Sequence, residues 1–165
     1  MSAFHSSGLA RKDARRWPAA APFVVVGGLA VIAAGLTSAA TALAPSYHAS
    51  WAVAYLVLVV GVAQVVLGLG QALLTPAPLP ARGTALQAAV FNLGNAGVLS
   101  GSLLDLPAFT WAGSALLVVV LAWMYASVRG ARGGGRLLLY AYRAVLAILF
   151  VSIPIGLLIA LQGSS

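Results

Sequence analysis

The chain is poor in charged and in reactive side chains. It contains no cysteine, no glutamate, two histidines and only two acidic residues, Asp13 and Asp105. The lack of cysteine excludes disulfides, thiolate chemistry and cysteine-based metal sites. Only 7% of its 165 residues are charged, whereas a soluble domain carries about 25%. So few charges cannot cover a surface that faces water, and we therefore expect the chain to lie in lipid.

Long apolar runs make up most of the sequence. A bilayer core of about 30 Å requires roughly 20 apolar residues of helix. Five segments reach this length, joined by short connections: residues 22–44, 51–74, 84–104, 108–128 and 137–161. The sequence thus predicts an all-α integral membrane protein, a helical bundle with five transmembrane helices. Residues 22–161 form its single domain, preceded by a basic N-terminal arm, 1–21, and followed by a tail, 162–165.

The basic residues predict the orientation of the spans. They lie before the first span, in the connections after the second and fourth, and near the start of the fifth: Arg11, Lys12, Arg15, Arg16, Arg82, Arg129, Arg132, Arg136 and Arg143. Loops rich in Lys and Arg stay in the cytoplasm. We therefore expect the N-terminal arm inside and the C-terminal tail outside. Abundant alanine and glycine, with more Arg than Lys, indicate a bacterial inner membrane.

The net charge of +7 would suggest nucleic acid as the partner of a soluble protein. Beside apolar spans, the same charge predicts contact with anionic lipid headgroups, through Arg129, Arg132, Arg136 and Arg143. Arg143 lies about six residues inside the fifth span, with no acidic residue at matching depth. Because a long arginine side chain can extend toward the membrane surface, lipid phosphate is its expected partner.

Aromatic residues and a turn mark the predicted span ends. Aromatic side chains favour headgroup depth, and they gather at both ends of the spans: Tyr47, Trp51, Phe109 and Trp111 outside, and Trp17, Trp123, Tyr125, Tyr140 and Tyr142 inside. Between the third and fourth spans, Asp105 and Pro107 predict a tight turn at the outer surface.

Polar side chains and glycines recur at helical spacing within two spans. In the second span they are Gly61, Gln64, Gly68 and Gln71, and in the third Asn92, Asn95 and Ser102, beside Gly94, Gly97 and Gly101. An amide in hydrocarbon needs a hydrogen-bonding partner. The favoured interpretation is that these two faces pack together, with glycines allowing close approach and amides bonding across. The alternative is that the amides line a ligand pocket or a polar path.

Pro154 lies in the middle of the fifth span. A proline there removes one backbone donor, so we expect a kink, with the carbonyl of Phe150 left free and Ser152 near enough to bond the local backbone. An architectural role is favoured over a hinge.

The sequence shows no evident catalytic, cofactor or metal site. Proton-coupled transport usually relies on a carboxylate inside a span, and none is present. Heme in a membrane bundle needs histidine ligands, and His5 and His48 both lie outside the predicted spans. His48, in the first outer connection, could still contribute one heme ligand or lie beside a quinone headgroup.

Part of the sequence resembles a known family. Gly61-Val-Ala-Gln64-Val-Val-Leu-Gly68, the proline-rich turn 76–80 and Asn92-Leu-Gly94 are similar to small bacterial membrane proteins that resemble part of the catalytic subunit of cbb3-type cytochrome oxidase, over residues 50–128. That family places a histidine shortly before the glycine of the second span. This chain has Ala52-Val-Ala-Tyr55 there, with His48 too early, so the resemblance implies the fold and not the heme ligand.

Three functions follow from these observations. The first is a non-catalytic accessory or structural subunit of a multi-subunit bacterial membrane complex, with respiratory complexes among the candidates. Its partners would be other membrane subunits or further copies of itself. The second is a small oligomeric channel or transporter with a neutral polar path. The third is a redox protein that holds a heme or a quinone.

Overall fold

The computed structural model describes residues 3–75, 80–130 and 135–162, and these residues form helices and no strand. Helix α1 spans Ala3–Thr41, and α2 spans Tyr47–Tyr55. A π-helix, η1, Leu56–Ala63, joins α2 to α3, Gln64–Leu74, so that the three form one continuous rod. Helices α4, α5 and α6 span Ala81–Leu103, Pro107–Ser127 and Arg136–Gln162. The predicted all-α class is confirmed for the described residues.

In the described part of the chain, four segments are long and apolar enough to cross a membrane: Pro18–Thr41, Tyr47–Leu74, Pro107–Ser127 and Arg136–Leu158. Their bounds lie within a few residues of four of the predicted spans. The fifth predicted span, 84–104, corresponds to α4, which is a single helix of 23 residues. Helix α4 is not among the four apolar segments. It is less apolar than they are because it carries the amides of Gln87, Asn92 and Asn95.

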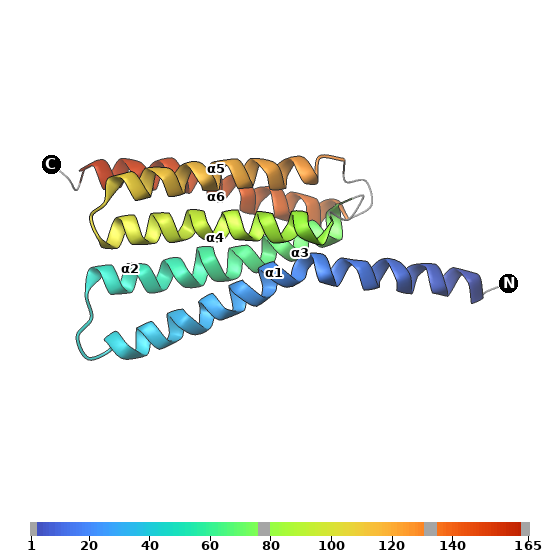
Figure 1. The fold of residues 1–165 in the computed structure, drawn as a ribbon, viewed down its shortest axis with the longest axis horizontal. Helices are drawn as coiled ribbons and strands as arrows, with labels where there is room; N and C mark the ends of the chain where they lie inside the picture. Colours follow the sequence, from blue (N-terminus) through green and yellow to red (C-terminus); the bar gives the residue numbers. More distant parts are fainter. Residues whose placement is uncertain (1–2, 76–79, 131–134, 163–165) are drawn as a thin grey trace.

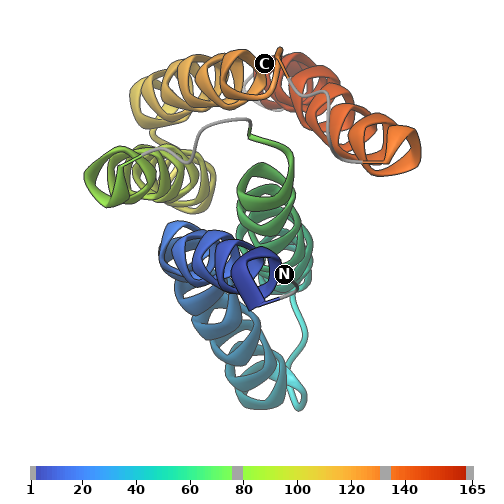
Figure 2. The same cartoon turned by 90° about the vertical axis from the view of Figure 1, so that its right-hand side faces the viewer.

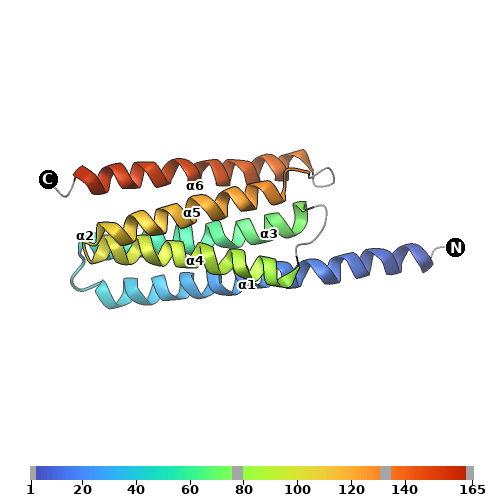
Figure 3. The ribbon, with the colours of Figure 1, turned by 45° about the horizontal axis from the view of Figure 1, so that its top comes forward.

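The chain reverses direction at each connection, so the rods lie roughly side by side (Figures 1 and 3). Helix α1 packs along the rod of α2, η1 and α3, and α4 packs most closely against α5. Helix α6 contacts α5 and α3 and lies at the edge of the bundle in the end view (Figure 2). The first part of α1 continues beyond the other helices (Figure 1), so the predicted N-terminal arm, from Ala3 onward, is helical.

The turn between α4 and α5 is tight, as predicted. Asp105 adopts a left-handed backbone conformation with φ of 53°, and the N–H of Leu106 donates to the carbonyl of Gly101 at 2.8 Å. This bond closes the end of α4 in the manner of a Schellman motif. Pro107 is the first residue of α5, where its fixed φ suits a helix start and its missing N–H costs nothing. Sequence and backbone chemistry thus agree at this corner.

Glycines allow close approach in this bundle, but between pairs of helices other than those predicted. A Cβ on Gly61 would lie 2.5 Å from Cγ2 of Val31, and one on Gly68 would collide with Phe23, so both glycines face α1. The predicted packing of these glycines against the third span is therefore wrong. Residues three apart on an α-helix point about 60° apart, which is enough for Gly68 to face α1 while Gln71 faces α4.

The glycines of α4 pack against α5 instead of α3. Gly94, Gly97 and Gly101 lie against Gly113, Phe109 and Thr110. A Cβ on Gly113 would lie 2.5 Å from the carbonyl oxygen of Gly94, so the two backbones are in contact there. The small residues of α4 and its amides therefore serve two different neighbours.

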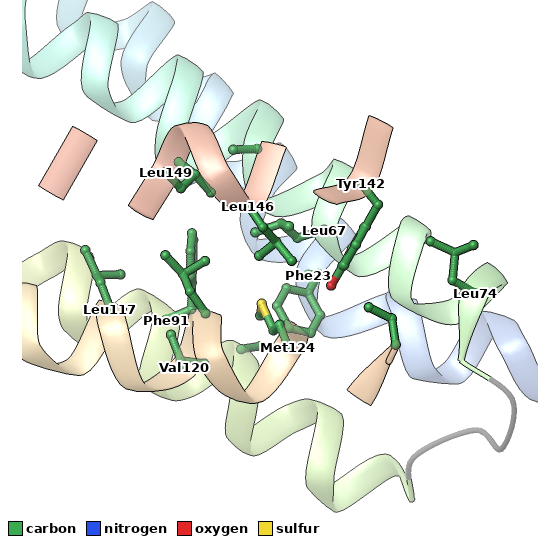
Figure 4. Close-up of a cluster of buried hydrophobic side chains, with 14 residues drawn as sticks. Phe23, Leu67, Leu74, Phe91, Leu117, Val120, Met124, Tyr142, Leu146 and Leu149 are labelled. Carbon is green, nitrogen blue, oxygen red and sulfur yellow. The ribbon is translucent and has the colours of Figure 1, made fainter. Parts of the chain in front are cut away.

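The hydrophobic core lies between α3, α4, α5 and α6, with Phe23 of α1 entering it. Phe23, Leu67, Phe91, Met124 and Tyr142 are all almost fully buried (Figure 4). Tyr142, predicted among the aromatic residues at headgroup depth, is buried within the bundle, and its depth in the membrane stays a prediction. Its ring lies against Gly70, where no side chain competes for the space, and it is only 1% exposed.

Helix α6 continues through Pro154 to Gln162. The hydroxyl of Ser152 donates to the carbonyl of Leu149 at 2.8 Å, so it bonds the local backbone as expected. The predicted kink and the free carbonyl of Phe150 stay predictions.

Candidate functional site

A chain of hydrogen bonds links three helices near the end of the bundle at which α4 begins. Nε2 of Gln71, on α3, donates to Oε1 of Gln87, on α4, at 2.8 Å. Nε2 of Gln87 donates in turn to the hydroxyl of Ser127, on α5, at 3.4 Å. Ser127 donates to the carbonyl of Trp123 at 2.9 Å. Both glutamines are buried, and these bonds pair Nε2 of Gln71 and both amide atoms of Gln87, which would otherwise lie unpaired in an apolar interior. Oε1 of Gln71 has no partner among the described residues.

A second cross-helix bond lies toward the other end of the same interface. The hydroxyl of Tyr55, at the end of α2, donates to Oδ1 of Asn95, on α4, at 2.7 Å. Nδ2 of Asn95 donates to the carbonyl of Phe91 in its own helix, at 2.8 Å. Asn95 is only 2% exposed. Its side chain is therefore oriented by one local bond and one bond to the neighbouring rod.

The π-helix allows both bonds to form. Tyr55 and Gln71 are 16 residues apart, and in an uninterrupted α-helix they would point about 160° apart. A π-helix bonds i to i+5, so each of its residues rotates the chain by less than in an α-helix. The eight residues of η1 take up this difference, and Tyr55 and Gln71 both face α4.

Gln64 lies between these two bonds along the rod, and it differs from the other amides. It is the first residue after η1 and is fully buried. Neither Nε2 nor Oε1 has a hydrogen-bonding partner among the described residues. An unpaired amide in an apolar interior costs about 1–3 kcal/mol on the scale of protein mutations. Oε1 of Gln71 also lacks a partner among the described residues, but Gln64 has none for either of its amide atoms.

The other predicted residues of the interface have lesser roles. Nδ2 of Asn92, half-buried, donates to the carbonyl of Ala88 within α4 at 2.7 Å. Ser102 is half-buried near the end of α4. Gln71 and Asn95 thus make the predicted bonds across the interface, whereas Asn92 bonds within its own helix.

Within α4, two amides and a threonine point inward, and a row of apolar residues points outward. Thr84, Gln87 and Asn95 are at most 3% exposed, whereas Leu86 is 54% and Leu93 63% exposed. Ala89 and Ala96, at the same spacing as the two leucines, are exposed as well. A helix in water shows the reverse distribution. The outer surface of α4 is therefore suited to lipid despite its amides.

His48 lies on the surface, as the second residue of α2. Its ring packs edge-on against Tyr47, with centroids 5.9 Å apart. One turn further along, Trp51 stacks on Tyr55 at 5.3 Å. Among the described residues, no three histidine, cysteine, aspartate or glutamate side chains cluster as metal ligands would. A role for His48 beside a heme or a quinone stays a prediction.

The predicted headgroup residues are split between surface and interior. Arg129 and Arg136 are exposed, whereas Arg143 is half-buried, and its Nε is buried without a hydrogen-bonding partner in the described part of the chain. Arg132 lies outside the described residues.

Sequence reasoning missed Gln87, Tyr55 and Ser127. Gln87 was detectable, because Thr84, Gln87, Phe91 and Asn95 follow the spacing of one helical face. The hydrogen bond from Tyr55 to Asn95 depends on the π-helix, and no local residue pattern predicts a π-helix there. Ser127 lies at the end of α5, and only the three-dimensional packing shows that it meets Gln87.

Comparison with protein families, with curated proteins and with solved structures finds no match to this chain. The resemblance to a cytochrome oxidase subunit stays a prediction, and residues 76–79 of its proline-rich turn lie outside the described part.

Proposed function

We propose that this chain is a non-catalytic subunit of a larger complex in a bacterial inner membrane, which it crosses five times with its N-terminus inside. The observation that carries the proposal is that three of its buried amides, Gln71, Gln87 and Asn95, make hydrogen bonds across helices. The bonds from Gln71 to Gln87 and from Tyr55 to Asn95 link the rod of α2, η1 and α3 to α4, and the bond from Gln87 to Ser127 links α4 to α5. Such bonds stabilise a bundle in lipid, where the hydrophobic effect between helices is absent.

The outward face of α4 supports five spans rather than four. Its 23 residues extend about 34 Å at 1.5 Å per residue, which is enough for a bilayer core. Leu86 and Leu93 face outward, and Gln87 and Asn95 are hidden. Part of the low mean apolarity of α4 comes from Gln87 and Asn95, which the bundle buries.

The chemistry of the chain supports a role as a subunit. The sequence offers no cysteine and no glutamate, and its two aspartates lie outside the apolar spans. The chain can offer a complex an apolar surface on α6. This helix contacts the bundle along one side, through Leu146, Leu149 and Tyr142. Its other side leaves Ile148, Val151 and Leu158 exposed.

One observation favours a second candidate, a neutral polar path through an oligomer. Gln64 lies between the two bonded pairs with both amide atoms unpaired. Together, Asn95, Gln64 and Gln87 form a line of buried amides along the rod of α2, η1 and α3. Solute flux into liposomes that disappears in Gln64→Met would favour this candidate over the subunit role.

The test of the subunit role is the state of the full chain after gentle extraction from its native membrane. We expect native mass spectrometry to find it in a complex of fixed stoichiometry with other membrane proteins. A chain that runs alone, or only with copies of itself, in a mild detergent contradicts the proposal.

A further inference from the structure

The described basic side chains lie at one end of the bundle. Arg82 is the second residue of α4, Arg136 begins α6, and Arg129 follows the end of α5. These helix ends lie together on the right in Figure 1, whereas Asp105 lies in the turn between α4 and α5 at the opposite end. This end therefore carries positive charge with no described carboxylate near it.

Two helix N-termini add to this positive charge. Helices α4 and α6 both begin at this end, and neither has an acidic residue in its first turn. The N-terminus of a helix carries partial positive charge, which an anion stabilises and a cation does not. Because Arg82 and Arg136 nevertheless occupy these first turns, the surface requires anions from outside the chain.

Two of these arginines and a tyrosine share one flank of α6. Arg136, Tyr140 and Arg143 follow the spacing i, i+4, i+7, so they lie on the same flank. The two arginine Cα atoms are separated by about 10 Å along the helix axis. Tyr140 is 65% exposed, whereas Tyr142, on the opposite side of α6, is buried. In the end view, α6 forms the edge of the bundle (Figure 2).

Arg143 is the unusual member of this flank. It lies two turns inside α6, half-buried, with its Nε buried and without a partner among the described residues. A guanidinium at this depth is costly unless an anion reaches it or it extends to the membrane surface. Leu137, beside Arg136, is 83% exposed, so apolar surface adjoins the charged flank.

We propose that this flank, Arg136, Tyr140 and Arg143 together with the N-terminus of α6, binds the phosphate of an anionic phospholipid. The phosphate lies between the two guanidinium groups, and the acyl chains lie along the apolar surface of α6 that includes Leu137 and Ile148. Free phosphate would satisfy the charges but would leave this surface uncovered. The proposal rests on membrane insertion and is independent of the role as a subunit, so its failure leaves that role standing.

The test is lipid binding by the full chain in mild detergent, measured by native mass spectrometry. Phosphatidylglycerol and phosphatidylcholine are titrated in parallel, and the wild type is expected to prefer phosphatidylglycerol by about fivefold or more. Arg143→Gln and Arg136→Gln should each remove most of this preference, and Arg143→Lys should keep part of it. The matched control is Arg82→Gln, which removes a charge at the same end but from a flank where position 89 is alanine. It should change the preference by less than about twofold.

Three results would overturn the proposal. Equal affinity for the two lipids would show that the flank does not select an anion. Equal losses in Arg82→Gln and Arg143→Gln would show a general surface charge and no built site. Displacement of phosphatidylglycerol by inorganic phosphate at equal concentration would show that the flank binds free phosphate. If Arg143→Gln fails to fold, Arg136→Gln decides, since Arg136 is exposed at the start of its helix.

Discussion

Helix α4 contacts α5 and the rod of α2, η1 and α3 by different means. Toward α5 it presents a glycine face, Gly94, Gly97 and Gly101, which meets the backbone of α5 at Gly113. Toward the rod of α2, η1 and α3 it presents an amide face, Gln87 and Asn95, which bonds to Gln71 and Tyr55. Contact at the glycine face requires that no side chain separates the helices. Contact at the amide face requires two side chains that bond to each other.

The difference shows how a helix with few large apolar residues can be stable in lipid. Between helices in a bilayer, close packing and polar bonds replace the hydrophobic effect. A glycine face should tolerate almost no added volume, because backbone atoms cannot move aside. An amide face should tolerate volume better but not the loss of one partner, because the other is then left unpaired.

The glycine face should give the largest effect. In Gly113→Leu, the new Cβ would lie 2.5 Å from the carbonyl oxygen of Gly94 and 2.6 Å from the backbone nitrogen of Val98. Overpacking usually costs 1–3 kcal/mol, and here the obstacle is backbone, so we expect the free energy of unfolding to fall by at least about 3 kcal/mol. Denaturant unfolding in micelles, followed by circular dichroism, measures this change.

Gly28→Leu is the matched control, since no atom lies within 4 Å of a Cβ at that position. It makes the same change in helix propensity, and its stability should change by less than about 1 kcal/mol. If the two variants proved equally stable, contact between the α4 and α5 backbones would not explain how this pair is held.

The amide face should give an intermediate effect. Gln87→Met keeps the approximate volume of the side chain but leaves Nε2 of Gln71 without its acceptor. We expect a loss of about 1–3 kcal/mol in the free energy of unfolding. The double variant Gln71→Met/Gln87→Met removes both groups and should recover part of this loss. A double-mutant cycle measures the coupling, and strictly additive losses would mean that the bond contributes nothing.

Gln64→Met should give the smallest effect, with the opposite sign. The same substitution here removes a buried amide that has no partner among the described residues, so the bundle should be unchanged or more stable by up to about 1 kcal/mol. The unfolding measurement used for Gln87→Met applies directly. A loss as large as that of Gln87→Met would show that Gln64 has a partner when the protein is in its membrane.

Several features of this fold were readable from the sequence. Four apolar spans and the turn at Asp105 follow from run length and from proline chemistry. The pairing of Gln71 and Asn95 with neighbouring helices follows from the cost of burying an amide. These features depend on single segments or on single groups, and a linear sequence describes both well.

Other features depend on the angles between helices, which the sequence does not display. The 60° between Gly68 and Gln71 assigns them to different neighbours, so the predicted common face was divided. The π-helix reorients Tyr55 without any distinctive residue. From the sequence, Tyr142 is expected among exposed aromatic residues near the headgroups. It is buried because Gly70, on another helix, leaves space for its ring.

The central claim is that α4 crosses the membrane because its polar residues are hidden within the bundle. The chain has no cysteine, so single cysteines at the two ends of α4 report its topology without background. We expect Leu104→Cys to react with a membrane-impermeant maleimide in intact cells, and Ala81→Cys to react only after permeabilisation. Labelling of both cysteines from the same side of the membrane would contradict the account.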